Sequence, residues 1–130
     1  MYKPEQNYRF YWRKTTGGGA EILRVFASSP KFDIPSEIAG YPVTELGTYC
    51  FAPDCPLPEE YMEITNPQGV CADNSITKLC GNYLSSIKLP DSLQKIGDYA
   101  FFNCRCLHSL EFAPGLQIIG SDAFMNCQKL

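Results

Sequence analysis

Residues 84–106 read LSSIKLPDSLQKIGDYAFFNCRC, and residues 107–129 read LHSLEFAPGLQIIGSDAFMNCQK. The two stretches match by residue type when one is shifted by 23 positions, and Leu130 starts the same interval again. Apolar residues that recur at one fixed offset are typical of a solenoid, in which each repeat forms one coil. The matched pairs include Leu84/Leu107, Ile87/Leu110, Leu89/Phe112, Leu93/Leu116, Ile96/Ile119, Gly97/Gly120, Ala100/Ala123, Phe101/Phe124, Asn103/Asn126 and Cys104/Cys127.

Each repeat predicts two short strands on opposite walls of a coil. Ser86–Leu89 alternates between polar and apolar residues, so one side of this strand faces the core. Gln94–Ile96 predicts the second strand. A period of 20–29 residues with this pattern is that of leucine-rich repeats. The predicted fold class is therefore a leucine-rich repeat solenoid, β-rich with short helical or 3-10 segments, in one continuous domain.

The second half of each repeat predicts the helical segment. Asp98–Asn103 fits a short helix or 3-10 turn, with Asp98 as the N-cap. Gly97 and Gly120 are expected where the backbone bends sharply or takes a positive φ. Phe101 and Phe124 are predicted to be stacked core residues.

The repeat pattern extends back to Phe32, with irregularities. The first repeat aligns well but carries five extra residues around 39–42. The second repeat is degenerate: Met62 and Ile64 resemble its strand, Asn66–Asn74 reads as a loop, and the helical segment is missing. Residues 32–130 are thus expected to form about four repeats.

Residues 1–31 do not follow the repeat and predict an N-terminal β-hairpin cap. Two alternating runs flank a turn of glycines at 17–19, and the first coil of a solenoid needs a lid over its apolar end. Trp12 with the neighbouring tyrosines is an alternative aromatic binding platform.

Composition excludes several classes of function. A chain of 130 residues suits one domain. Its net charge of −3 and its lack of a basic stripe give no reason to expect nucleic acid. We expect no membrane insertion, because no apolar run approaches the ~18 residues that span a bilayer. The start lacks the apolar core of a signal peptide.

Seven cysteines are an odd number, so at least one stays unpaired. We expect mostly reduced thiols, with Cys104 and Cys127 buried beside each other and inert. No metal site is expected, because Cys106 aligns with exposed positions and a structural zinc site needs four convergent ligands. His108 is the only histidine, and no catalytic set is legible, so the sequence predicts neither an enzyme nor a cofactor.

Residues 34–44, IPSEIAGYPVT, and 89–101, LPDSLQKIGDYAF, resemble the BspA-like leucine-rich repeat family, whose repeat reads approximately L-x-x-I-x-[IL]-P-x-S-[VL]-x-x-I-G-x-x-A-F-x-x-C. The resemblance covers Phe32–Leu130, and Phe10–Phe26 is similar to the cap that precedes such repeats. It implies a non-enzymatic module for protein contact and adhesion, part of a longer bacterial surface protein. The family has no shared catalytic residues, so none is carried over.

The remaining candidate site is the concave wall of the solenoid, a surface for an unidentified protein partner. A solvated polar face without a partner stays open as the simpler interpretation. The surface comprises the polar residues of the predicted strands: Lys31, Asp33, Tyr61, Glu63, Ser86, Lys88, Ser109 and Glu111.

An alternative function is an intracellular cysteine-rich protein that responds to redox state or metal. Location is equally open. The resemblance implies the cell surface or the extracellular space, whereas the lack of a signal peptide leaves the cytoplasm as the alternative.

The sequence also predicts an exposed core at the last repeat, because Leu130 only begins a further unit. Either the chain is a piece of a longer array or this end is buried against another molecule. We predict end-to-end self-association through the C-terminal repeat. The exposed core residues would be Leu110, Phe112, Leu116, Ile119 and Phe124.

Overall fold

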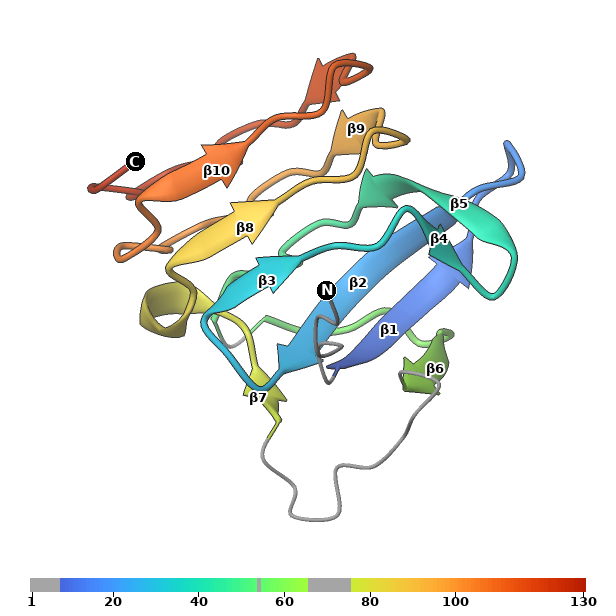
Figure 1. The fold of residues 1–130 in the computed structure, drawn as a ribbon, viewed down its shortest axis with the longest axis horizontal. Helices are drawn as coiled ribbons and strands as arrows, with labels where there is room; N and C mark the ends of the chain where they lie inside the picture. The colour runs from blue at the N-terminus through green and yellow to red at the C-terminus, as the bar shows by residue number, and fades with distance from the viewer. Residues whose placement is uncertain (1–7, 54, 66–75) are drawn as a thin grey trace, which may run out of the picture.

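A computed structural model describes residues 8–53, 55–65 and 76–130 (Figure 1). The predicted loop Asn66–Asn74 lies outside the described residues. The elements are β1 (Tyr8–Lys14), β2 (Ala20–Ala27), β3 (Lys31–Asp33), β4 (Glu37–Ile38), β5 (Tyr41–Leu46), β6 (Met62–Thr65), β7 (Thr77–Lys78), the 3-10 helix η1 (Gly81–Tyr83), β8 (Ser86–Lys88), β9 (Lys95–Ile96), β10 (Ser109–Glu111) and β11 (Ile118–Ile119).

Three parallel strands, β3, β8 and β10, form what we call the front sheet, which faces the viewer in Figure 1. Phe32 pairs with Ile87, and Ile87 pairs with Leu110. The offset between β8 and β10 is the predicted repeat interval. Successive repeats therefore stack in register, one strand spacing of about 4.8 Å apart.

The remaining described strands form the back sheet, with the order β11-β9-β5-β2-β1-β6; β4 and β7 pair at its sides. Leu46 pairs with Ile96, and Ile96 pairs with Ile119, so the second strand of each repeat also stacks in register. The β1–β2 hairpin continues this sheet, because β2 pairs in parallel with β5. The predicted hairpin cap is confirmed.

The core between the two sheets contains a column of phenylalanines. The Phe51 and Phe101 ring centroids are 4.9 Å apart, and the Phe101 and Phe124 centroids are 5.0 Å apart with an interplanar angle of 6°. The predicted stacking is confirmed. Phe101 is fully buried, whereas Phe124 is only half-buried, because no coil stacks on the outer side of the last repeat.

The expected second repeat does not form a coil. Strand β6, predicted to lie in the wall beside β3, instead pairs antiparallel with β1, with Phe10 opposite Ile64. Strand β7 pairs antiparallel with β2. Since β3 pairs directly with β8, the described chain stacks three coils rather than four. Residues 58–65 and 76–83, which we call the excursion, lie outside this stack.

Residues 98–103 form consecutive hydrogen-bonded turns, where the sequence predicts a short helix or a 3-10 turn. The backbone N–H groups of Ala100 and Phe102 each donate to a carbonyl three residues earlier. Asp98 does not cap its own segment: its Oδ1 accepts a 2.8 Å hydrogen bond from the N–H of Ser121 in the next coil. The carboxylate thus links two repeats.

Gly97 and Gly120 do not take a positive φ, which was one of the two alternatives predicted for these positions. A Cβ on Gly97 would lie 2.8 Å from the backbone carbonyl carbon of Gly47 in the neighbouring coil. Close approach of two backbones is therefore the reason for glycine here.

The extra residues of the first repeat form a tight hairpin between β4 and β5. Ala39 and Gly40 both have positive φ, at 51° and 85°. Two such central residues are those of a type I′ turn, whose twist matches paired strands. The insertion therefore extends the coil without disturbing the stacking of β5.

Arg24 is a buried cation on β2, with 2% of its surface exposed. Its guanidinium donates to the carbonyl oxygen of Cys55 at 3.0 Å and to that of Pro56 at 2.9 Å. It also donates to the carbonyls of Leu23 and Thr48. The planar fork of one side chain thus joins the hairpin cap to the turns of the first coil.

Candidate functional site

The front sheet places six of the predicted surface residues together. Lys31, Ser86 and Ser109 lie in one row across the strands, and Asp33, Lys88 and Glu111 lie in another. The residues between the rows, Phe32 and Ile87, are buried. The predicted alternation is therefore confirmed on β3 and β8, and on β10 Leu110 is half-buried between exposed Ser109 and Glu111.

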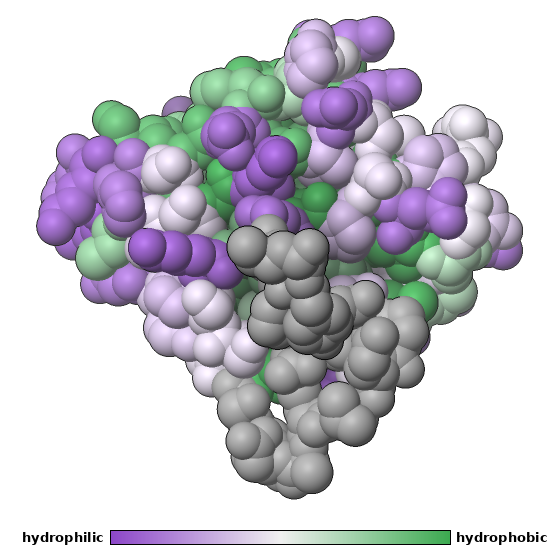
Figure 2. Space-filling model, in the orientation of Figure 1, coloured by the Kyte–Doolittle hydropathy of each residue, from purple (hydrophilic) through white to green (hydrophobic). Residues whose placement is uncertain are grey.

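The second row is a stripe of alternating charge, which we call the charged stripe: Asp33, Lys88 and Glu111. All three side chains are exposed, and each lies one strand spacing from the next. Lys88 thus has a carboxylate on either side, an arrangement that is modestly favourable between neighbouring strands. In Figure 2, which faces this sheet, hydrophilic residues form a band across its strands.

A hollow of about 260 Å³ lies at the end of the stripe, where β3 and β8 finish. Asp33 and Lys88 contribute to its wall, and Leu89 and Pro90 give it an apolar part. The front sheet therefore combines exposed charged groups with a partly apolar hollow.

Tyr61 and Glu63 do not belong to this surface. Glu63 lies on β6 in the back sheet, opposite Tyr11 of β1. The ring centroids of Tyr61 and Tyr11 are 4.7 Å apart. Burial raises the pKa of Tyr11, and the carboxylate of Glu63 raises it further. Tyr61 and Glu63 therefore lie beside strand β1 of the hairpin and not on the front sheet.

The alternative aromatic platform around Trp12 does not form. Trp12 is buried, with 4% of its surface exposed, and its ring lies 6.0 Å from that of Tyr41. Tyr61 is the exposed aromatic on this side and lines a hollow of about 370 Å³ with Arg13 and Lys14.

The last coil exposes large apolar side chains, as the sequence predicts. Phe112 has 54% of its surface exposed and Ile119 has 51%. Leu110, Leu116 and Phe124 are half-buried. Figure 2 shows hydrophobic residues at the surface over this end of the molecule. Strands β10 and β11 are both edge strands here, so each sheet ends in unpaired backbone groups.

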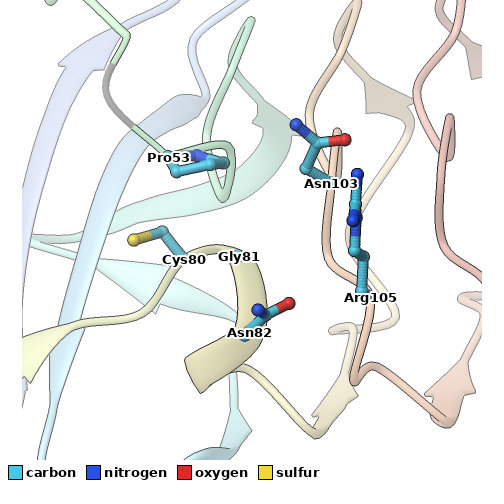
Figure 3. A pocket seen from close by; sticks show the side chains of 6 residues that line it. All are labelled: Pro53, Cys80, Gly81, Asn82, Asn103 and Arg105. Carbon is cyan, nitrogen blue, oxygen red and sulfur yellow. The ribbon is translucent and has the colours of Figure 1, made fainter.

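A third hollow, of about 280 Å³, lies between the turns of the first and second coils (Figure 3). The sequence does not predict this hollow. The turn beside it is marked in the sequence only by asparagine at both Asn103 and Asn126, one repeat interval apart. Its lining comprises Pro53, Cys80, Gly81, Asn82, Asn103 and Arg105.

The six cysteines in the described residues are free thiols. Burial raises the pKa of Cys104 to about 12, and the neighbouring Cys127 thiol adds to the effect. Burial also raises the pKa of Cys50 and of Cys127. In the described part of the chain, no three histidine, cysteine or acidic side chains are grouped to hold a metal.

These thiols should differ sharply in reactivity. In native protein at neutral pH, iodoacetamide is expected to modify Cys106 and Cys55, which are partly exposed, and to leave Cys50 and Cys104 unmodified, since only the thiolate reacts. After denaturation all cysteines should react. Mass spectrometry of digested protein gives the order, and equal rates at Cys104 and Cys106 in native protein would favour the redox-responsive alternative.

The chain is similar to known leucine-rich repeats. Residues 73–130, somewhat less than half of the chain, match a family described as a BspA type leucine rich repeat region of six copies. No curated protein gives a significant match. In the described residues, no helix has the length and apolar character needed to cross a bilayer.

Two solved structures are similar over most of the chain. The T. pallidum leucine rich repeat protein is 26% identical with a TM-score of 0.68, over 93% of this chain and 44% of that one. A leucine rich cell surface protein from Faecalibacterium prausnitzii A2-165 is 22% identical with a TM-score of 0.64, over 93% of this chain and 27% of that one. The chain thus spans less than half the length of either protein.

Proposed function

Because residues 73–130 match the BspA type leucine-rich repeat family, we propose that the chain is a protein-interaction module of a bacterial cell-surface protein and binds its partner through the front sheet. Leucine-rich repeat families are in general non-enzymatic binding modules, so no reaction is assigned. One of the similar structures is named a leucine rich cell surface protein, which supports the location.

The observation that carries the proposal is the charged stripe. Asp33, Lys88 and Glu111 come from three coils and share one exposed row. A partner that fits this row presents basic groups to the two carboxylates and an acceptor to the lysine. The hollow beside Pro90 then receives an apolar side chain of the partner.

Charge reversal in the middle of the stripe tests this. Lys88→Glu gives three adjacent carboxylates, so the affinity for a partner is expected to fall by about tenfold or more. Lys95→Glu is the matched control, since Lys95 is an exposed lysine on β9 of the back sheet. The readout is binding of the purified partner, first identified by cross-linking from a site on the stripe. Equal effects of both variants would place the interface elsewhere.

We also propose that the last coil binds a second copy of this chain. At this end the two sheets stop together, at β10 and β11. At the other end the front sheet stops at β3, while the back sheet continues through β2, β1 and β6. A head-to-tail contact therefore cannot pair both sheet edges. A two-fold, tail-to-tail contact can pair both, with antiparallel strands across it.

Sedimentation over a concentration series measures this association. We expect a monomer–dimer equilibrium that Phe112→Glu shifts to monomer, because a charge would then face the same charge across the two-fold axis. Tyr83→Glu is the control, since Tyr83 is a comparably exposed aromatic in η1. A wild-type chain that stays monomeric at high concentration would contradict the proposal.

A further inference from the structure

The hollow in Figure 3 exists because a side-chain ladder between coils is interrupted. Asn126 donates from Nδ2 to Oδ1 of Asn103 at 2.8 Å, which joins the third coil to the second. The equivalent position of the first coil is Pro53, whose ring offers neither donor nor acceptor. The ladder therefore stops at Asn103, and the space that the next asparagine would occupy is open.

This interruption leaves the side-chain amide nitrogen of Asn103, with its two N–H donors, available. Its Oδ1 is used by Asn126, so its Nδ2 is the group left over. In Figure 3 the amide nitrogen of Asn103 points to the side of Pro53, and the oxygen points away. No acceptor for this nitrogen lies among the described residues.

Arg105 adds a charged donor to the same space. Its side chain is exposed, and the guanidinium has no hydrogen bond or ion pair to any residue that the structure describes. Asn82, on η1 across the hollow, likewise has no side-chain partner in the described ranges. Among the described residues that line the hollow, none is acidic. The lining is therefore rich in donors and carries one positive charge.

We infer that this hollow binds a carboxylate, held by the Arg105 guanidinium and the side-chain amides of Asn103 and Asn82. The guanidinium fork matches the two oxygens of a carboxylate, and an amide N–H can donate to the remaining lone pairs. The site lies away from the front sheet and does not depend on the partner proposed there. The carboxylate belongs either to an acidic side chain, to a chain terminus or to a small free acid.

Nuclear magnetic resonance titration of the full chain tests the inference and separates these sources. The probes are a capped Gly-Glu-Gly peptide, an acetylated peptide with a free C-terminal glycine, and acetate. A capped Gly-Gln-Gly peptide is the neutral control, and sodium sulfate at equal ionic strength is the control for general anion binding. The resonances followed are the Nε–H of Arg105 and the side-chain amides of Asn82 and Asn103.

We expect at least one carboxylate probe to shift these resonances saturably, and the tightest of the three identifies the source. Arg105→Gln should weaken that binding about tenfold, the usual effect of losing hydrogen bonds to a charged group. Arg9→Gln, which removes an arginine from the hairpin instead, should leave it unchanged. No saturable shift, equal shifts with sulfate or with the glutamine peptide, or binding retained by folded Arg105→Gln would each overturn the inference.

Discussion

Replacing Phe101 with alanine is expected to lower the free energy of unfolding by about 3–5 kcal/mol, the range for a fully buried phenylalanine. The ring is stacked on both sides, by Phe51 and by Phe124, and none of its surface is exposed. Its removal opens a cavity in the middle coil, where neither neighbouring coil can close it. Urea unfolding followed by circular dichroism measures the loss.

Two variants control for this effect. Phe101→Leu keeps most of the volume and should cost less than about 1.5 kcal/mol. Phe124→Ala should cost clearly less than Phe101→Ala, because the Phe124 ring is stacked on one side only and is half-buried. Equal losses at the two phenylalanines in dilute monomer would mean that the last coil is covered, contrary to the structure.

Replacing Arg24 with alanine is expected to lower the free energy of unfolding by roughly 2–6 kcal/mol, because at least two backbone carbonyls lose their donor at about 1–3 kcal/mol each. The substitution leaves the carbonyl oxygens of Cys55 and Pro56 without their donor, since both accept hydrogen bonds from the guanidinium, at 3.0 and 2.9 Å. These hydrogen bonds are partly buried, so each acceptor left without a donor carries a desolvation penalty wherever water cannot reach it. The hairpin cap would also lose its link to the first coil.

Arg24→Lys separates charge from geometry. The ammonium keeps the charge but cannot reproduce the planar fork, so an intermediate loss is expected. Arg9→Ala removes an arginine from β1 of the same hairpin and should change stability by no more than about 0.5 kcal/mol. If Arg24→Ala unfolds at the same urea concentration as wild type, water replaces the guanidinium, and the hydrogen bonds of Arg24 do not stabilise the attachment of the hairpin cap to the first coil.

The stacked part of the fold was predictable because its signal is periodic. Each apolar position is repeated, so the pairing of Ile87 with Leu110 and of Ile96 with Ile119 follows from one offset. The hairpin was predictable from two alternating runs around glycines. The places of Ser86, Lys88, Ser109 and Glu111 follow from the same offset, whereas Lys31 and Asp33 pair with β8 at a separation of 55 residues.

The placement of Tyr61 and Glu63 was not predictable in this way. A four-residue strand such as β6 shows which of its sides is apolar but not which strand it pairs with. Its partner β1 lies about fifty residues earlier in the chain, and no repeat relates the two. The missing coil follows from this pairing, since a strand that completes the cap cannot also extend the front sheet.

Arg24 and the carboxylate hollow also needed the structure. The sequence carries one hint for Arg24, a charged residue inside the apolar run Ile22–Phe26. Its partners are backbone carbonyls, which have no residue type to recognise. The hollow depends on a proline where an asparagine would continue the ladder, and a single difference between irregular repeats gives no signal of a cavity.

The excursion has a consequence for the order of folding. Neighbouring residues of β8 and β10 are 23 positions apart, whereas Phe32 and Ile87, which are equally close in space, are separated by 55. Closing the longer loop costs roughly 0.8 kcal/mol more in chain entropy. Contacts between the second and third coils should therefore form before those between the first and second. The contacts of the β1–β2 hairpin are also local, so we expect two early regions of structure, the hairpin and the last two coils, that meet at the first coil.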